Sequence, residues 1–169
     1  MDFFRATERS MAMTDAVWMR HANPWSVWTR FTCLPLILLA LWSRTWLGWW
    51  ALLPLTLACL WTWWNPRAFP PPERTDNWAS KGTFGERVFL NRHNVPIPDH
   101  HHRWAIALGF GSAIGLIPMV WGIWAYDLTM TLLGVVLVVL PKVWFVDRMV
   151  WLYEDMKDAD PIYRSWLKS

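Results

Sequence analysis

The chain of 169 residues is 54% hydrophobic and contains 17 tryptophans, a composition that excludes an ordinary soluble domain. The apolar stretches 31–64 and 104–140 hold one charged residue each, Arg44 and Asp127, and runs of this length require lipid around them. The net charge of +3 does not indicate nucleic-acid binding, because the basic residues do not form one tract with stacking aromatic residues between them.

The first apolar stretch predicts two membrane-spanning helices, at about 24–43 and 46–64. Asn23 followed by Pro24 is typical of a helix start, because asparagine caps free backbone amides and proline suits the first helical position. At ~1.5 Å per residue the first helix is ~30 Å long, which is about the thickness of the hydrocarbon layer. The very short link at 44–45 makes the two helices an antiparallel hairpin.

The second apolar stretch predicts another hairpin, with spans at about 103–126 and 128–146 around a turn at Asp127. The helical pattern continues over 147–158, because no helix-breaking residue occurs before Pro161. We therefore expect an all-α membrane protein that forms a single domain. Its four transmembrane helices make two antiparallel hairpins, and its last helix extends past the membrane.

The distribution of basic residues predicts the orientation of these spans. Four spans place both termini and the loop 65–102 on one side, and of the sixteen Lys and Arg residues only Arg44 lies in an outer turn. The side rich in basic residues is the cytoplasmic side. We therefore expect a multi-pass protein of the cell inner (cytoplasmic) membrane, with both termini cytoplasmic. Tryptophans near the span ends form two aromatic belts: Trp42, Trp46, Trp121 and Trp124 outside, and Trp25, Trp28, Trp61, Trp63, Trp64, Trp104 and Trp144 inside.

The loop 65–102 is expected to be an ordered lid over the cytoplasmic mouth of the bundle, because a structureless loop of this length is uncommon. Thr83 and Glu86 match a capping box, which predicts a short helix from Phe84 to about Asn91. Capping gives Glu86 a structural role, which stands beside a functional one.

Polar residues expected on the cytoplasmic face define a candidate pocket for an amphipathic small molecule or an ion. Arg30 lies inside the first span and is expected either to pair with Asp147 or to reach lipid headgroups. Asp147 and Glu154 share a helix face with Trp151 between them, which suits cation binding or acid–base chemistry as well as a solvated helix end. The candidate ligand-binding residues are His21, Asn23, Arg30, Asn65, Arg67, Glu86, Arg87, Asp147, Arg148, Trp151 and Glu154.

His100, His101 and His102 are candidate metal ligands in a dense run after Asp99. A helix start disfavours the positive imidazolium, which leaves neutral rings. However, adjacent positions on a helix point in different directions, and no His-x-x-x-His or cysteine pair gives recognised ligand geometry, so a solvated surface is the alternative. No histidine lies in mid-membrane, which argues against paired axial haem ligands, and the sequence indicates no other cofactor.

Gly111 and Gly115, with Ser112 beside them, form a GxxxG pattern that lets another helix approach closely. Packing inside the bundle is favoured over dimerisation. The expected partner is the lipid bilayer, with a larger membrane complex or a homo-oligomer as alternatives and no nucleic acid.

Four tryptophan-rich or charged phrases are specific enough to suggest a family: HANPWSVWTRF, WTWWNPRAFPPP, GERVFLNR and WFVDRMVWLYEDM. Together they resemble a family of small tryptophan-rich prokaryotic membrane proteins known as a domain of unknown function. The resemblance spans about His21 to Lys157, implies a four-span membrane protein and supplies no activity or catalytic residues. Two function classes fit: a protein whose pocket binds or transforms an amphipathic ligand or ion and, alternatively, an accessory or structural subunit of a larger membrane complex.

Overall fold

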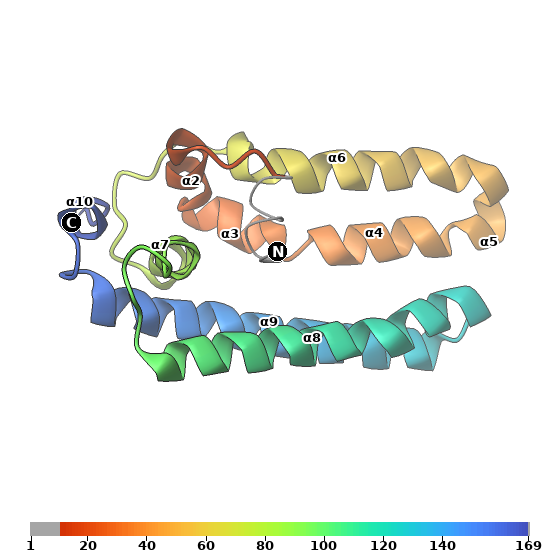
Figure 1. Cartoon of the computed structure of the whole chain (residues 1–169). Coiled ribbons are helices and arrows are strands. Elements are labelled where there is room, and N and C mark those ends of the chain that lie inside the picture. Colours follow the sequence, from red (N-terminus) through yellow and green to blue (C-terminus); the bar gives the residue numbers. More distant parts are fainter. Residues whose placement is uncertain (1–10, 169) are drawn as a thin grey trace.

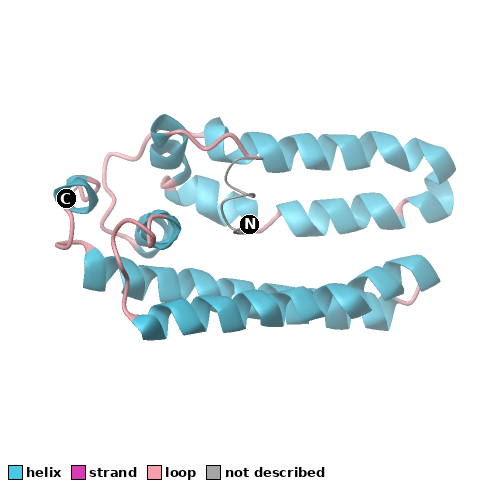
Figure 2. Ribbon diagram, viewed as in Figure 1, coloured by secondary structure: helices cyan, strands magenta, loops and turns pink. Residues whose placement is uncertain are grey.

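The computed structural model describes residues 11–168, and over these residues the chain is helical with no strand (Figures 1 and 2). The all-α class predicted from the sequence is confirmed. The helices are α2 (Asp15–His21), α3 (Pro24–Arg30), α4 (Cys33–Trp42), α5 (Arg44–Leu47), the 3-10 helix η1 (Gly48–Ala51), α6 (Leu52–Ala68), α7 (Trp78–Leu90), α8 (Asp99–Ala125), α9 (Leu128–Met156) and α10 (Pro161–Ser165).

The segment 24–68 folds back on itself. α3 and α4 run in one direction, α5 and η1 reverse the chain, and α6 returns beside α4 (Figure 1). Gly48 has a φ of 54° in this reversal, a conformation that glycine adopts without strain. The first predicted span is not continuous, because the helix breaks at residues 31–32. Pro35 explains the break, since it has no N–H for the carbonyl of Phe31 and its ring would clash with that carbonyl.

α8 and α9 form an antiparallel pair that is packed along its length (Figure 1). A Cβ atom on Gly115 would lie 2.7 Å from the backbone of Leu137, so the two helix backbones are almost in contact there. Ser112 donates a hydrogen bond to the carbonyl of Val138 at 3.0 Å. The GxxxG pattern therefore packs inside this chain.

α7 begins earlier than the sequence suggested, and the predicted capping box is wrong. Asn77 is the N-cap residue, and its side chain accepts a hydrogen bond from the backbone N–H of Ser80 at 2.9 Å. Thr83 lies inside the helix and donates to the carbonyl of Ala79 at 3.2 Å. Glu86 is therefore not a capping residue, and its carboxylate is free for another partner.

The buried core lies where α7 packs on α9 and α10, at one end of the long helices (Figure 1). A Cβ atom on Gly85 would lie 1.8 Å from the carbonyl oxygen of Met149, so only glycine allows this contact between α7 and α9. The rings of Phe84 and Tyr153 lie 5.3 Å apart beside it. The buried cluster comprises Ala22, Phe84, Val88, Phe89, Ala105, Leu108, Phe145, Val146, Met149, Leu152, Tyr153, Met156, Tyr163 and Trp166.

The long helices carry large apolar side chains on their outer surfaces. Trp49 and Trp50, at the first chain reversal, are 87% and 78% exposed. Within the described part of the chain, three segments are long and apolar enough to cross a membrane: Pro24–Ala68, Asp99–Ala125 and Leu128–Met156. Apolar surface of this extent is stable in lipid and costly in water, which indicates membrane association.

The ends of several helices differ from the predicted limits. α6 continues past residue 64 to Ala68, and α8 begins at Asp99, four residues before the predicted start at 103. α9 continues without a break beyond 146 to Met156, as the continuous helical pattern indicated. These extensions lengthen three of the helices at the end where α7 lies.

Candidate functional site

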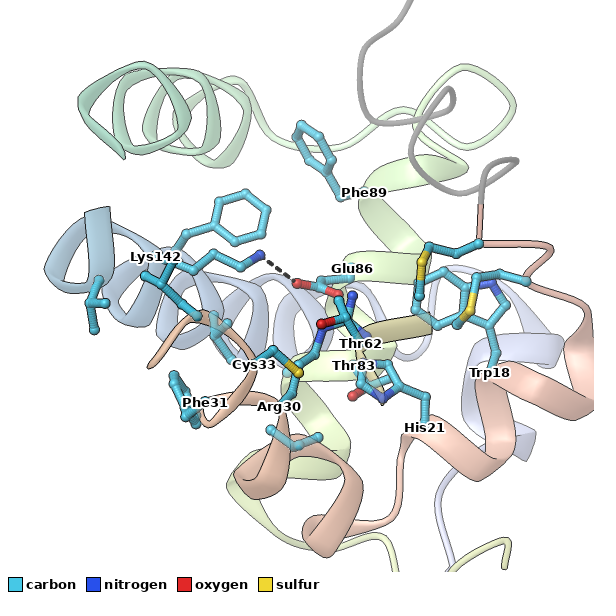
Figure 3. Close-up of a pocket in the computed structure, with 18 of the residues that line it drawn as sticks. Trp18, His21, Arg30, Phe31, Cys33, Thr62, Thr83, Glu86, Phe89 and Lys142 are labelled. Atoms are coloured by element: carbon cyan, nitrogen blue, oxygen red, sulfur yellow. Dashed lines mark hydrogen bonds and ion pairs between the residues drawn. The ribbon is translucent and has the colours of Figure 1, made fainter. Parts of the chain in front are cut away.

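A cavity of about 500 Å³ lies between α2, α3, α4, α6, α7 and α9 (Figure 3). Its wall is mostly apolar and includes Trp18, Phe31, Leu34 and Val138. The polar lining residues are His21, Arg30, Thr62, Thr83, Glu86 and Lys142.

Three charged side chains from three helices meet at this cavity. Lys142 Nζ lies 3.2 Å from Glu86 Oε1 and makes an ion pair with it. A quarter of the Glu86 side chain (25%) is accessible, and that surface faces the cavity. Arg30 also lines the cavity, and among the described residues it has no hydrogen-bond or ion-pair partner. The site thus holds two positive charges and one negative charge.

A chain of hydrogen bonds connects His21 through Ser26 to Asn65 and Thr29. The Thr29 hydroxyl donates to the carbonyl of Trp25 at 2.6 Å, so its oxygen accepts from the Asn65 amide nitrogen at 2.8 Å. That orientation turns the Asn65 side-chain oxygen toward Ser26, whose hydroxyl donates to Asn65 oxygens at 3.3 and 3.4 Å. With the Ser26 hydrogen directed to Asn65, Ser26 Oγ accepts from His21 Nδ1, 2.8 Å away. In the neutral ring Nε2 then carries the free lone pair.

His21 is neutral at physiological pH. Burial lowers the pKa of His21 from the ordinary 6.5 to about 3; the positive charge of Arg30 adds to this effect, and Lys142 contributes less. Glu86 opposes the shift without reversing it. Nε2 is therefore an unprotonated acceptor, and it has no hydrogen-bond partner among the described residues.

Glu86 is ionised at the same pH. Burial opposes its ionisation, but Lys142, His21 and Arg30 together outweigh burial and lower the pKa of the Glu86 carboxyl. Because His21 is neutral near pH 7, the two permanent cations supply the favourable field. The net charge of the four groups is therefore positive.

The charged groups lie at one level of the long helices. Lys142 lies on α9, roughly 22 Å from Asp127 at ~1.5 Å per residue, and Arg30 lies at the end of α3, beside the break before α4. The charged groups of the cavity therefore lie toward the end of α9 that packs on α7, away from the turn at residues 126–127.

Among the residues predicted for the pocket, His21, Arg30 and Glu86 line the cavity. Asn65 does not line it but contacts His21 indirectly, through the Ser26 hydroxyl. The predicted pairing of Arg30 with Asp147 is wrong. Asp147 accepts a hydrogen bond from the indole N–H of Trp78 at 3.0 Å and does not line the cavity.

Asn23, Arg67 and Arg87 serve other contacts. Asn23 caps α3 as predicted, and its amide donates to the carbonyl of Pro70 at 3.0 Å, which ties the loop to α3. Arg67 lies over the ring of Trp63 at 4.2 Å. Arg87 pairs with Asp15 and lines a second cavity of about 450 Å³ near α10.

Arg148, Trp151 and Glu154 also lie outside the cavity. The Arg148 guanidinium lies over Trp104 at 5.2 Å, and Trp151 is 58% exposed. Glu154 makes an ion pair with Lys81 of α7 at 2.8 Å. This end of α9 therefore holds α7 in place through its charges.

Lys142 lines the cavity but was not among the residues predicted for the pocket. A signal was present, because Lys142 is a charged residue inside the predicted span 128–146, and such residues are functional candidates by default. Its acidic partner lies far away in the chain, on α7, and no spacing rule connects the two.

The three adjacent histidines 100–102 do not point to the same place in the structure. The rings of His100 and His101 lie together, with centroids 4.1 Å apart, whereas His102 stacks on Phe89 at 6.2 Å. Asp155, which was not among the predicted ligands, contacts His101. One ligand atom from each of His100, His101 and Asp155 lies within 4.8 Å of the other two, so the structure groups Asp155 rather than His102 with these two histidines.

The chain was compared with known proteins. A model described as a family of unknown function, DUF6653, matches residues 6–167. No curated protein and no solved structure matches the chain. The chain therefore belongs to this family of unknown function.

Proposed function

We propose that the protein is a four-span inner-membrane protein whose cytoplasm-facing cavity binds the head of an amphipathic anion. The two chain reversals, at α5 with η1 and at residues 126–127, support a path of two hairpins across the bilayer. The excess of basic residues on the side of α7 supports a cytoplasmic location for that side.

The observation that carries the proposal is Arg30, a cation that has no hydrogen-bond or ion-pair partner within residues 11–168 and lies in the same cavity as the Glu86–Lys142 ion pair. A charge at membrane depth is costly unless it is paired. An anionic head group supplies a partner for Arg30, and Lys142, which lines the same cavity, adds a second positive charge. A guanidinium can bind a phosphate or carboxylate through two parallel hydrogen bonds.

His21 indicates which functional groups the head of the ligand carries. Nε2 of His21 has no hydrogen-bond partner among the described residues, and in the tautomer in which Nδ1 donates to Ser26 it offers a lone pair to a ligand. The best ligand head therefore combines a negative charge with an O–H or N–H donor. A singly protonated phosphate monoester has both features.

The apolar residues of the cavity wall indicate that the ligand has an apolar tail. Leu34 of α4 and Val138 and Val139 of α9 line the cavity on the side that leads into the membrane segments. An alkyl chain in contact with these residues gains the transfer free energy of burial. The ligand is thus expected to enter from the lipid phase with its tail.

The proposal is tested with matched amphiphiles on the purified full-length protein in a neutral maltoside detergent. Dodecyl phosphate, dodecanoate and dodecyltrimethylammonium share a tail and differ in the head. Dodecyl phosphate should bind best and raise the unfolding temperature, and Arg30→Gln should weaken its binding at least about tenfold, or about 1.4 kcal/mol.

The matched control is Arg74→Gln, which removes an exposed arginine that does not line the cavity. It should bind dodecyl phosphate like the wild type. Equal binding by Arg30→Gln, or preference for the cationic amphiphile, would disprove the proposal.

A further inference from the structure

A second cluster of polar side chains lies where the start of α8 meets the end of α9. His100 and His101 are in the first turn of α8, and Asp155 is near the end of α9. One ligand atom from each residue lies within 4.8 Å of the other two. We propose that these three residues bind a divalent transition-metal ion of the zinc class.

His101 is the central residue of this site. It is only 2% exposed, and its Nε2 lies 2.8 Å from Asp155 Oδ2. Its other ring nitrogen, Nδ1, is buried and has no hydrogen-bond partner among the described residues. Buried ring nitrogens nearly always have a bonding partner. The bonding capacity of His101 is therefore not fully used by the described residues, and a ligand can use it.

His100 brings a second imidazole to the same place. Side chains of adjacent helical residues usually diverge, but here the two ring centroids lie 4.1 Å apart with the planes tilted by 39°. Zinc binds imidazole nitrogen and carboxylate oxygen at about 2.1 Å, so the ligand atoms of one ion lie within ~4 Å of each other. Small side-chain rotations bring the cluster to that spacing.

The donor set selects the class of metal. Two imidazoles and one carboxylate suit Zn²⁺ and its neighbours, whereas Mg²⁺ and Ca²⁺ prefer oxygen ligands alone. Asp155 offsets part of the positive charge of the ion. His100 and Asp155 are exposed, so water has access to a fourth position.

An ion at this site would join the first turn of α8 to the last turns of α9. The position is separate from the cavity that holds Arg30, since none of the three ligands lines it. Metal binding is therefore independent of amphiphile binding.

The experiment uses the full-length protein without a histidine tag, in neutral detergent, after treatment with a chelator. Isothermal titration with Zn²⁺ should show one saturable site per chain. His100→Ala and Asp155→Asn should each weaken binding at least about tenfold. These exposed ligands are changed because replacement of the buried His101 would disturb folding as well as binding.

His102→Ala is the control, because His102 stacks on Phe89 and is outside the cluster. It should bind Zn²⁺ like the wild type, as should Arg30→Gln. Substitution of Co²⁺ gives a second readout, in which visible absorption of a tetrahedral ion should appear in the wild type and be lost in Asp155→Asn.

Absence of saturable binding would overturn the proposal. So would an unchanged affinity in Asp155→Asn, or a loss in His102→Ala equal to that in His100→Ala. Either of these last two results would mean that the histidine run chelates metal as a flexible surface.

Discussion

His21 and Asn65 show how single residues prepare the cavity for a ligand. Asn65 is fully buried, and both ends of its amide are engaged by hydroxyl groups of α3. This arrangement orients Ser26 and, through it, His21. His21 is the member of this network that lines the cavity, and its contact with Ser26 holds the ring before a ligand binds, which lowers the entropy cost of binding.

The low pKa of His21 predicts that acid destabilises the folded protein. The unfolded chain binds a proton near pH 6.5, whereas the folded state binds it only near pH 3, so the contribution of His21 is full above 6.5 and is lost as the pH falls toward 3. Between about pH 7.5 and about pH 5.5, the wild type should lose about 1 kcal/mol more than His21→Gln.

Thermal unfolding in detergent across this pH range measures the difference. The ionised Glu86 loses its contribution in a more acidic window, because its pKa is lowered from 4.5. An equal pH slope in the wild type and in His21→Gln would show that His21 is accessible to protons in the folded state.

At the scale of secondary structure, glycines decide how closely the helices pack. Gly115 and Gly111 are on the same helix, α8, one turn apart, but their surroundings differ. A Cβ atom on Gly115 would lie 2.7 Å from the α9 backbone, whereas one on Gly111 would be 3.8 Å from Pro141, an ordinary contact.

Gly115→Ala should therefore destabilise the protein by about 1 to 3 kcal/mol, because two helix backbones would have to separate. Gly111→Ala should be neutral or slightly stabilising, since alanine is the better helix former by about 1 kcal/mol. Unfolding temperatures in detergent provide the test. Equal effects of the two substitutions would contradict the close packing of α8 on α9.

The close packing of α7 on α9 determines which partner Glu86 has. Gly85 places α7 on the backbone of α9, and this contact brings Glu86 to Lys142. The capping box predicted from Thr83 and Glu86 would have engaged the same carboxylate locally. Because this capping box does not form, the Glu86 carboxylate is available to pair with Lys142 at the cavity.

At the scale of the whole molecule, both chain reversals lie at one end, with α7 and α10 at the other (Figure 1). Arg44 connects the reversals, because its guanidinium lies over Tyr126 at 4.4 Å and donates to carbonyl groups at the end of α8. A cation at a helix C-terminus is favourable. This contact makes the two hairpins end at the same level.

The proposed topology predicts opposite labelling of the two ends. In a background with Cys33 and Cys59 replaced by alanine, Thr45→Cys should react with a membrane-impermeant maleimide in intact cells. Ser165→Cys in α10 should react only after the membrane is opened. Both positions are exposed, so access depends on sidedness. The reverse pattern would place α7 and α10 outside the cytoplasm.

The sequence by itself determined the helical class, the membrane character and the approximate helices, including the Asn23 cap. These properties follow from the length and order of apolar segments, which act locally along the chain. The GxxxG pattern also indicated close helix packing correctly, because small residues permit it wherever they occur.

Only the tertiary structure decided which polar residues meet. His21, Arg30, Glu86 and Lys142 come from four helices, and their approach depends on how each helix is rotated and how closely it packs. The same reason explains why Asp155 replaces His102 beside His100 and His101. Contacts between distant segments leave no periodic signal in one sequence, so the charged cavity appears only when the helices are assembled.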